Sequence, residues 1–581
     1  MRTDELDFSA LCQDGNGAAL PSDAVDVCIV GGGINGAGIA RDLAGRGHRV
    51  LLCEKDDLAQ HTSSNSTKLI HGGLRYLEYY EFGLVRKALA EREVLLKSAP
   101  HIMWPLRFVM PHAATLASQR PAWMIRLGLF LYDHLARREL LPGSHAVDLR
   151  RHPAGAALKA GFTQGFVYSD GWVDDARLVV LNAIDAAARG ATVLTHWRCV
   201  DAQRGATDWR VALRDASGAT RRVTARALVN AAGPWAAQFL GEHAHVATPK
   251  ALRLVKGSHI VVPKLFDHDH AYILQNADKR ITFAIPYERD FTLIGTTDVE
   301  HHGAIGAARV DAAETDYLCA QASRYFAVPV TPRDVVWSYA GVRPLLDDES
   351  GDPAAVTRDY RLELDAPGPA KTGVPQDRNT GVPVEPRAPL LTVWGGKITT
   401  FRKLAEEAAD LLTAPLGASG GTATPRRGWT RDAQLPGGDL HAWTGATGHA
   451  KVDLHADFAR FVQVVRTRYP QLGGALCERL ARAYGTRIEL LLGPAQAPFA
   501  LGAEVAPGLY EAELHYLFRH EWARCADDVL WRRSKLGLHL TAAQRDAVAR
   551  WCTAHAPQTG RAGLAELAAV AAVADAAAPP R

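Results

Sequence analysis

The stretch DVCIVGGGINGAGIARDLAGRGHRVLLCEK (Asp26–Lys55) decides the fold. An apolar run at Val25–Val30 leads into a cluster of glycines, and small and apolar residues at helical spacing follow it. A second apolar run, His48–Cys53, closes the stretch. This order predicts a strand, a tight turn, a helix and a second strand, which is the first unit of a Rossmann-like fold.

The glycine turn has the spacing of a dinucleotide-binding site. Gly31, Gly33 and Gly36 form G-x-G-x-x-G, and Glu54 follows at the end of the second predicted strand. Glycines let the backbone approach a pyrophosphate, and the helix N-terminus offers free N–H groups. The glutamate can accept the ribose hydroxyls, and it disfavours a 2′-phosphate and therefore NADP.

The segment after the second strand favours FAD over NAD. HTSSNSTK (His61–Lys68) is rich in hydroxyl and amide groups. Such groups suit hydrogen bonds to phosphate and to the ribitol chain of a flavin. The candidate cofactor contacts in this segment are Thr62, Ser63 and Ser64.

Two later glycine turns favour the same cofactor. ALVNAAGPWA (Ala227–Ala236) is a short apolar strand that ends near Gly233, and LLTVWGGKITTFRKLAEEAADLL (Leu390–Leu412) is a strand, a glycine pair and a helix. A helix that begins just after Gly396 can stabilise negative charge on a reduced flavin ring. The order of these segments resembles the FAD-dependent oxidoreductases of the amino-acid-oxidase type, in which sequence-distant pieces hold one cofactor.

Length and composition set the class of protein. The 581 residues are 47% hydrophobic and 22% charged, which predicts two or three globular domains. The formal net charge of +3 argues against a nucleic-acid partner. The eight cysteines form no C-x-x-C pair, so we expect a reduced compartment, no metal site, and core positions for Cys28 and Cys53. The acidic start, MRTDELDFSA, does not resemble a secretory signal or a transit peptide.

Eight blocks of sequence together resemble one family more closely, the aerobic, respiratory glycerol-3-phosphate dehydrogenases of bacteria. The blocks are GGGINGAGIARDLAGRG, TSSNSTKLIHGGLRYLEYYEF, YSDGWVDDARLV, KGSHIVVP, YILQNADKRITFAIPYE, IGTTDVE, YAGVRPLLDDES and WGGKITTFRKLAE. The resemblance covers about Asp26 to Trp551. It implies oxidation of sn-glycerol 3-phosphate to dihydroxyacetone phosphate, with FAD as cofactor and ubiquinone or menaquinone as electron acceptor, and it allows a homodimer. Two departures, the N-terminal extension and the Pro/Gly-rich insertion Lys371–Arg387, touch none of these motifs.

A small phosphorylated alcohol needs fixed cations around its phosphate. Arginine suits this task because its planar fork binds two phosphate oxygens at once. The resemblance puts Arg75, which follows HGGL, and Arg343, in a predicted turn before a proline, in the substrate pocket. It adds Tyr76 and Lys397 nearby, and Lys397 could serve the phosphate or the reduced flavin. The alternative for both arginines is an ion pair with a surface carboxylate.

Oxidation of an alcohol also needs a base, and histidine is the natural candidate near neutral pH. Composition cannot choose among 23 histidines. The resemblance favours His259, which we expect to follow a glycine turn and begin a strand. His71 is the rival, although a role in holding the flavin suits it better, and Thr399 is a further candidate cofactor contact.

The segment RPAWMIRLGLFLYDHLARREL (Arg120–Leu140) sets apolar residues between arginines. Its apolar run, Leu127–Tyr132, is far too short to span a bilayer. Periodicity alone favours a buried core helix with snorkelling arginines. The quinone acceptor that the resemblance implies favours attachment to the membrane surface instead. We therefore expect a cytoplasmic protein attached peripherally to the inner face of the cell membrane.

The predicted architecture is α/β plus α. A Rossmann-like FAD-binding domain of the amino-acid-oxidase type is interrupted by an antiparallel-sheet substrate domain and followed by a helical domain. The predicted bounds are 1–24 for an N-terminal extension, 25–99 with 166–239 and 389–416 for the discontinuous FAD-binding domain, 100–165 for a membrane-contact or cap segment, 246–388 for the substrate domain, 424–567 for the helical C-terminal domain and 568–581 for a tail.

Three other functions are compatible with these patterns. The first is a soluble oxidase of the same substrate that makes hydrogen peroxide, and the second is an amine or amino-acid oxidase on the same fold. The third, of a different class, is a non-catalytic flavoprotein whose C-terminal domain recruits a partner. Arg75, Arg343 and Lys397 argue against this scaffold, because it needs no phosphate pocket.

Overall fold

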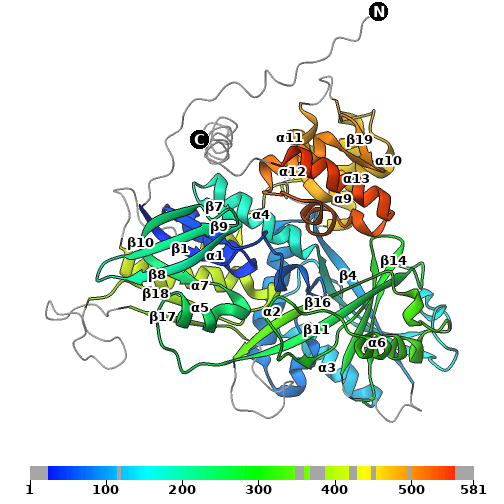
Figure 1. Cartoon of the computed structure of the whole chain (residues 1–581). Coiled ribbons are helices and arrows are strands. Elements are labelled where there is room, and N and C mark those ends of the chain that lie inside the picture. Colours follow the sequence, from blue (N-terminus) through cyan, green and yellow to red (C-terminus); the bar gives the residue numbers. More distant parts are fainter. Residues whose placement is uncertain are drawn as a thin grey trace, which may run out of the picture.

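The structure is a computed structural model that describes residues 24–113, 120–278, 280–346, 359–366, 386–417, 428–445, 453–494 and 500–556. These residues form two large sheets with their helices and a helical C-terminal region (Figure 1). Residues 1–23 of the expected extension, 371–385 of the expected insertion and the expected tail, 568–581, lie outside the described residues.

The first sheet contains the predicted nucleotide-binding unit. Strand β1 (Ala24–Val30), helix α1 (Ile34–Gly45) and strand β2 (Val50–Glu54) confirm the expected strand, turn, helix and strand. β1 pairs in parallel with β2 on one side and with β10 on the other. The further strands of this sheet are β7 (Thr192–Thr195), β8 (Trp197–Arg204), β9 (Trp209–Asp215), β10 (Thr220–Asn230), β17 (Arg361–Asp365) and β18 (Leu390–Trp394).

Side chains from both faces of this sheet are buried. Val27 and Ile29 belong to a core shared with α1, α4 (Asp175–Ala188) and α7 (Phe401–Leu416), and α1 contacts both other helices. Cys28 and Cys53 belong to a second core, shared with β8, β9 and α5 (Ala236–Glu242). This two-sided burial explains why the strands have nearly continuous apolar sequences. It also confirms that the two cysteines are core residues.

The second sheet is mainly antiparallel, as the β-branched runs predict. Its long strands β11 (Leu252–Pro263) and β16 (Trp337–Leu346) pair over most of their lengths, with His259 opposite Tyr339. The other strands are β3 (Leu69–Ile70), β4 (Met103–His112), β5 (His145–Asp148), β6 (Gln164–Val173), β12 (Ala271–Gln275), β13 (Ile281–Tyr287), β14 (Phe291–Gly295) and β15 (Val299–Glu300). Helices α2 (Phe82–Ser98), α3 (Ala122–His134) and α6 (Ala312–Tyr325) complete this half.

Three local expectations differ from the structure. Gly257 lies inside β11 rather than in a turn. A side chain would not fit there, because a methyl group would lie 2.7 Å from the Arg343 guanidinium. Arg343 likewise lies in β16 rather than in a turn before Pro344. β4 and β6 pair with each other in the second sheet, although β4 was expected in a cap and most of β6 in the FAD-binding domain.

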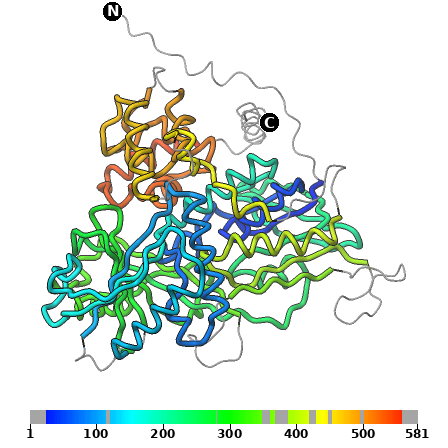
Figure 2. The backbone as a smooth tube through the Cα atoms, turned by 180° about the vertical axis from the view of Figure 1, so that it is seen from behind, coloured from blue at the N-terminus to red at the C-terminus, as the bar shows by residue number. Residues whose placement is uncertain are grey.

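The C-terminal region is helical, as its 3.6-residue periodicity predicts. Its apolar residues form a core of their own. In Figures 1 and 2 these orange and red elements lie at one end of the molecule, next to parts of both sheets. The elements are α8 (His441–Thr444), α9 (Leu454–Arg468), α10 (Gly474–Tyr484), α11 (Ile488–Leu492), α12 (Glu511–His520), α13 (Ala542–His555), the π-helical turn η10 (Asp528–Arg533) and the hairpin β19 (Glu504–Ala506) and β20 (Leu509–Tyr510).

Candidate active site

The glycine turn between β1 and α1 is shaped for close backbone approach. A methyl group at Gly36 would lie 1.9 Å from the carbonyl oxygen of Gly31, so only glycine fits there. Gly31 has φ +113°, and a methyl group on it would lie 2.4 Å from the carbonyl oxygen of Ala231. Helix α1 starts after Gly33 with no acidic residue in its first turn. The positive end of the helix is therefore open to a pyrophosphate.

Glu54 closes this turn from the end of β2. Its Oε2 accepts the N–H of Gly32 at 2.7 Å, and its Oε1 accepts the N–H of Asp56 at 2.9 Å. Burial raises the pKa of Glu54, while these two backbone N–H groups oppose the shift. The carboxylate thus fixes the turn and lines the cavity beside it, where ribose hydroxyls would meet it.

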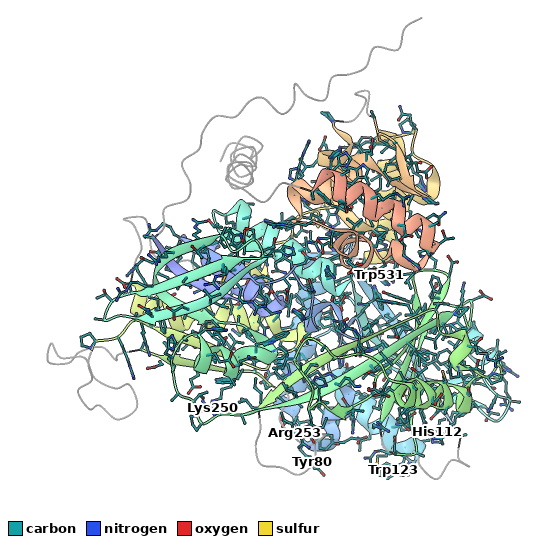
Figure 3. The ribbon with its side chains drawn as sticks, viewed as in Figure 1. Tyr80, His112, Trp123, Lys250, Arg253 and Trp531 are labelled. Carbon is teal, nitrogen blue, oxygen red and sulfur yellow. The ribbon has the colours of Figure 1, made fainter. Side chains whose placement is uncertain are left out.

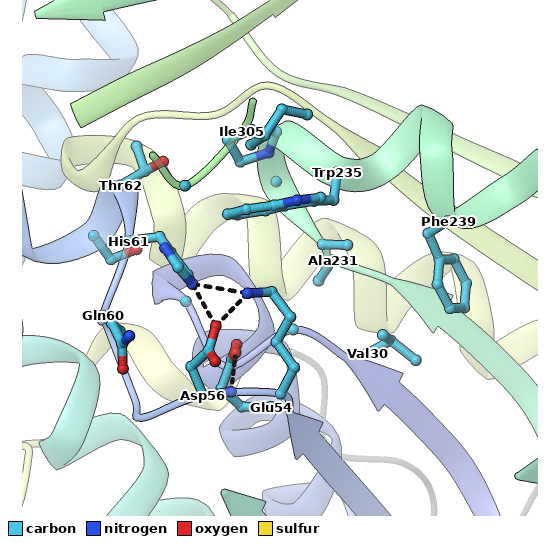
Figure 4. Close-up of a pocket in the computed structure, with 18 of the residues that line it drawn as sticks. Val30, Glu54, Asp56, Gln60, His61, Thr62, Ala231, Trp235, Phe239 and Ile305 are labelled. Atoms are coloured by element: carbon cyan, nitrogen blue, oxygen red, sulfur yellow. Dashed lines mark hydrogen bonds and ion pairs between the residues drawn. The ribbon is translucent and has the colours of Figure 1, made fainter. Parts of the chain in front are cut away.

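A cavity of 750 Å³ extends from the glycine turn along the carboxyl ends of the parallel strands. Figure 4 shows part of its wall, where Lys55 bonds to His61 at 3.1 Å and forms an ion pair with Asp56. Glu54, Asp56 and His61 each place one potential metal ligand within 4.8 Å of the others. Because Lys55 already neutralises this group, we assign it no metal.

The predicted cofactor residues lie mostly along this cavity. Gly233 and Gly396 line it, with φ +56° and +105°. Ser63 lines it too and accepts the N–H of Ile34 at 3.0 Å. Thr62 lines it and donates its hydroxyl to the carbonyl of Val342 at 2.7 Å. The residues that line the cavity do not include Ser64, whose hydroxyl bonds to the carbonyl of His61 at 3.5 Å.

Beyond the cavity, four of the predicted residues come together. The Lys397 Nζ lies 3.8 Å from the centroid of the Tyr76 ring. The N–H of His71 bonds to the Thr399 hydroxyl at 3.3 Å. Burial, together with the charges of Lys397 and Arg343 and against that of Asp170, lowers the pKa of His71 to about 4. His71 is therefore a neutral side chain within the electrostatic reach of both cations.

Arg343 is half-buried and held in place by its neighbours. Its Nη1 forms an ion pair with Asp298, and its Nη2 lies 3.3 Å from the Thr296 hydroxyl. Arg343 thus pairs with a carboxylate, as the alternative for this arginine expects. The pair is not on the open surface, however, since the Asp298 side chain is only 19% exposed.

His259 is 1% exposed and stacks on Tyr339, with ring centroids 4.8 Å apart. Its Nε2 lies 2.9 Å from the Thr67 hydroxyl, and its Nδ1 has no hydrogen-bond partner among the described residues. Burial lowers its pKa well below the usual range, and the charges of Arg343 and Lys68 add to the shift. The ring is neutral at physiological pH.

Arg75 contacts Tyr79, and its place in the substrate pocket stays a prediction. It lies in the 3-10 helix Leu74–Tyr79, with its Nη2 3.3 Å from the Tyr79 hydroxyl and its guanidinium 5.9 Å from that ring. The structure thus brings Arg343, Lys397, Tyr76 and His71 together and leaves Arg75 beside Tyr79.

Several residues that position the site were missed by sequence reasoning. Asp298 and Thr67 hold Arg343 and His259. Asp170 accepts the Tyr132 hydroxyl at 2.7 Å, and that hydroxyl in turn accepts the N–H of Gly72 at 2.8 Å. Asp298 lies in the quoted block IGTTDVE and Asp170 in YSDGWVDD, so the blocks themselves were the available signal.

This fold and cavity define a class, the FAD-dependent oxidoreductases. Residues 26–361 match the family described as "FAD dependent oxidoreductase", and residues 429–562 match "C-terminal domain of alpha-glycerophosphate oxidase". The glycine turn, the open helix end and the cavity fit FAD, which is the cofactor of this class.

The chain belongs to the FAD-dependent glycerol-3-phosphate dehydrogenase family. It is 49% identical over 540 residues to "Glycerol-3-phosphate dehydrogenase" of Pseudomonas aeruginosa, covering 93% of this chain and 97% of that one. It is 48% identical over 530 residues to "D-erythritol 1-phosphate dehydrogenase" of Brucella abortus, covering 91% and 98%. The glycerol-3-phosphate dehydrogenase of Bacillus halodurans, solved with FAD, superimposes with a TM-score of 0.69 at 25% identity over 97% of each chain.

Proposed function

We propose that this enzyme oxidises sn-glycerol 3-phosphate to dihydroxyacetone phosphate and delivers the electrons to a membrane quinone. The observation that carries the proposal is that Arg343 and Lys397 both act electrostatically on the neutral His71, while their sequence neighbours Pro344 and Gly396 line the FAD cavity. A dianionic phosphate fits between two such cations. The names of the relatives supply the substrate class.

In this proposal, Arg343 and Lys397 bind the phosphate and Tyr76 restrains Lys397. Asp298 holds one side of the Arg343 guanidinium, so the arginine is already oriented before substrate arrives. Pre-orientation lowers the entropy that binding would otherwise cost. Arg75 is retained as a second phosphate contact, which requires its side chain to turn away from Tyr79.

We assign His259 as the base that takes the proton from the substrate hydroxyl. FAD, when bound, would supply the acceptor for the hydride of the substrate carbon that bears this hydroxyl. The Thr67 hydroxyl orients the His259 ring, and Nδ1, which bonds to no other described residue, is the nitrogen that would accept the proton. His71 is the second candidate, because its pKa of about 4 also leaves it neutral and its ring is less buried.

An exposed apolar patch supports attachment to the membrane surface, where a quinone would be reached. Helix α3 buries Ile125, Leu129 and Tyr132 and yet exposes apolar side chains on its other face. Figure 3 shows Trp123 and Tyr80 along the same lower edge of the molecule. We define the apolar patch as Trp123, Leu127, Phe130 and Leu131 of α3 with Tyr79, Tyr80 and Phe82 beside it.

Arginines surround the apolar patch. The Arg137 side chain is 88% exposed, and Arg120 at the start of α3 is half-exposed. Apolar side chains ringed by arginines suit the interface of a membrane with anionic lipids. Among the described helices, none is both long and apolar enough to cross a bilayer. We therefore propose a peripheral attachment on the cytoplasmic face.

Anaerobic reduction of the bound flavin tests the reaction. We expect sn-glycerol 3-phosphate to bleach the flavin, and glycerol without the phosphate to fail. D-erythritol 1-phosphate is the second candidate substrate, since a relative of nearly equal identity is named for it. Faster bleaching by the four-carbon phosphate would reassign the substrate. Oxygen uptake as fast as quinone reduction would favour an oxidase, and no bleaching by either phosphate would favour a scaffold.

A further inference from the structure

One of the contacts between the C-terminal region and the FAD-binding half is a buried ion pair at Asp57. Arg533, at the end of η10, donates from Nη1 and Nη2 to the two carboxylate oxygens of Asp57, both at 2.7 Å. Neither side chain is exposed to solvent. The neighbouring Arg532 adds a bond from Nε to the same carboxylate at 2.6 Å. Residues more than 470 positions apart in the sequence thus meet at one acid.

Asp57 lies in the segment that holds the glycine turn. Three residues before it, Glu54 accepts the N–H of Gly32 at 2.7 Å. Two residues after it, Ala59 donates its N–H to the carbonyl of Gly32 at 3.2 Å. Between them Leu58 is fully buried, and a methyl group at Gly32 would lie 3.0 Å from its Cδ2. The segment Glu54–Ala59 therefore holds Gly32 from both sides.

We propose that Arg533 is a positioning residue for the FAD site, which acts by pairing with Asp57 to hold Glu54–Ala59 against the glycine turn. Without Arg533 the buried Asp57 carboxylate would keep only the single bond from Arg532, which disfavours its burial, so the segment would shift toward water. That shift would pull Glu54 and Ala59 away from Gly32. In this proposal FAD binds tightly only when Glu54–Ala59 lies against Gly32. The apparent affinity for FAD would therefore fall with the fraction of molecules in that arrangement. By linkage, FAD would in turn stabilise the docked C-terminal region.

Two other ion pairs provide controls, one buried and one partly buried. Arg177 of α4 donates to the Glu521 carboxylate of the C-terminal region, a docking contact that does not touch Asp57, although the Glu521 carbonyl also accepts from Arg533. Arg479 donates to Glu513 at 2.7 and 2.6 Å, a contact inside the C-terminal region. Substitution of either arginine should lower stability without a direct effect on the glycine turn. Comparing substitutions at the three arginines thus distinguishes an effect on the Glu54–Ala59 segment from a general loss of stability.

The test is titration of the full-length apoprotein with FAD, followed by flavin fluorescence well below the melting temperature. Arg533→Met should weaken FAD binding tenfold or more, Arg533→Lys less than that, and Arg479→Lys and Arg177→Lys less than twofold. The kcat of Arg533→Met at saturating FAD should stay near the wild-type value. FAD should raise the melting temperature of the wild type more than that of Arg533→Met.

Two results would overturn the proposal. One is an Arg533→Met protein that binds FAD within twofold of the wild-type affinity. The other is an equal loss of affinity in Arg177→Lys, which would make docking in general the cause. If Arg533→Met does not fold, Arg532→Met replaces it, because that side chain contributes one bond to Asp57 and is partly exposed. We expect about threefold weaker FAD binding there, and unchanged binding would likewise refute the role of the pair.

Discussion

Replacing two residues of the apolar patch, Trp123→Ser with Phe130→Ser, should release the enzyme from membranes. The exposed fractions of these side chains are 65% and 52%. Full burial of a large apolar side chain stabilises by about 1.5–3 kcal/mol, so the two exposed parts together contribute about 3 kcal/mol on entering the interface. That free energy corresponds to about a 100-fold weaker partition into the membrane.

The assay is sedimentation with vesicles that contain anionic phospholipid, at several salt concentrations. The matched control is Val328→Ser, since Val328 is 69% exposed but lies outside the patch. Flavin reduction in the absence of vesicles should be unchanged in both variants, because neither change touches the cavity. Added salt should weaken the wild-type interaction further, since exposed arginines attract the lipid headgroups. A double variant that partitions within threefold of the wild type, or a control that falls as far, would refute the membrane assignment.

Three further predictions concern the interior. Burial raises the pKa of Glu288 to about 7 from its usual 4.5, so the free energy of unfolding should fall as pH rises across this interval. Urea titrations at the two ends of this pH interval should show that the free energy of unfolding of Glu288→Gln depends less on pH than that of the wild type. An equal pH dependence in both proteins would contradict the raised pKa. Thr67→Val should lower kcat about tenfold, because the His259 ring loses its hydrogen bond, while KM should change little. Steady-state kinetics would instead show equal changes in kcat and KM if Thr67 were only structural. Gly36→Ala should abolish FAD binding, because its methyl group would lie 1.9 Å from the Gly31 carbonyl oxygen, and a yellow purified variant would contradict this.

Local patterns predicted the nucleotide-binding unit well. The strand, turn and helix from Ala24 to Gly45 depend on side chains within a few residues of each other, so the sequence contains the whole signal. Gly257 shows where such reasoning fails. A glycine is typical of a turn, but here it makes room inside β11 for the guanidinium of Arg343 from the neighbouring strand.

The residues that position the site could not be predicted in the same way. Asp298 and Arg343 are 45 positions apart, and Thr67 and His259 are 192 apart. Each pair forms only in the folded protein, where the second sheet brings distant parts of the chain together. The resemblance named Arg343 and His259 as candidate site residues, whereas their pairing with Asp298 and Thr67 follows from the tertiary structure.

The most direct test of the account is the second-order rate constant for anaerobic flavin reduction by sn-glycerol 3-phosphate in Arg343→Ala. We predict a loss of about 100-fold with FAD still bound, because one charge-assisted phosphate contact is removed. Arg150→Ala, which removes an exposed arginine paired with Asp148, should reduce flavin at the wild-type rate. A wild-type rate in Arg343→Ala would show that this guanidinium does not hold the phosphate, and the proposed substrate site would then be wrong.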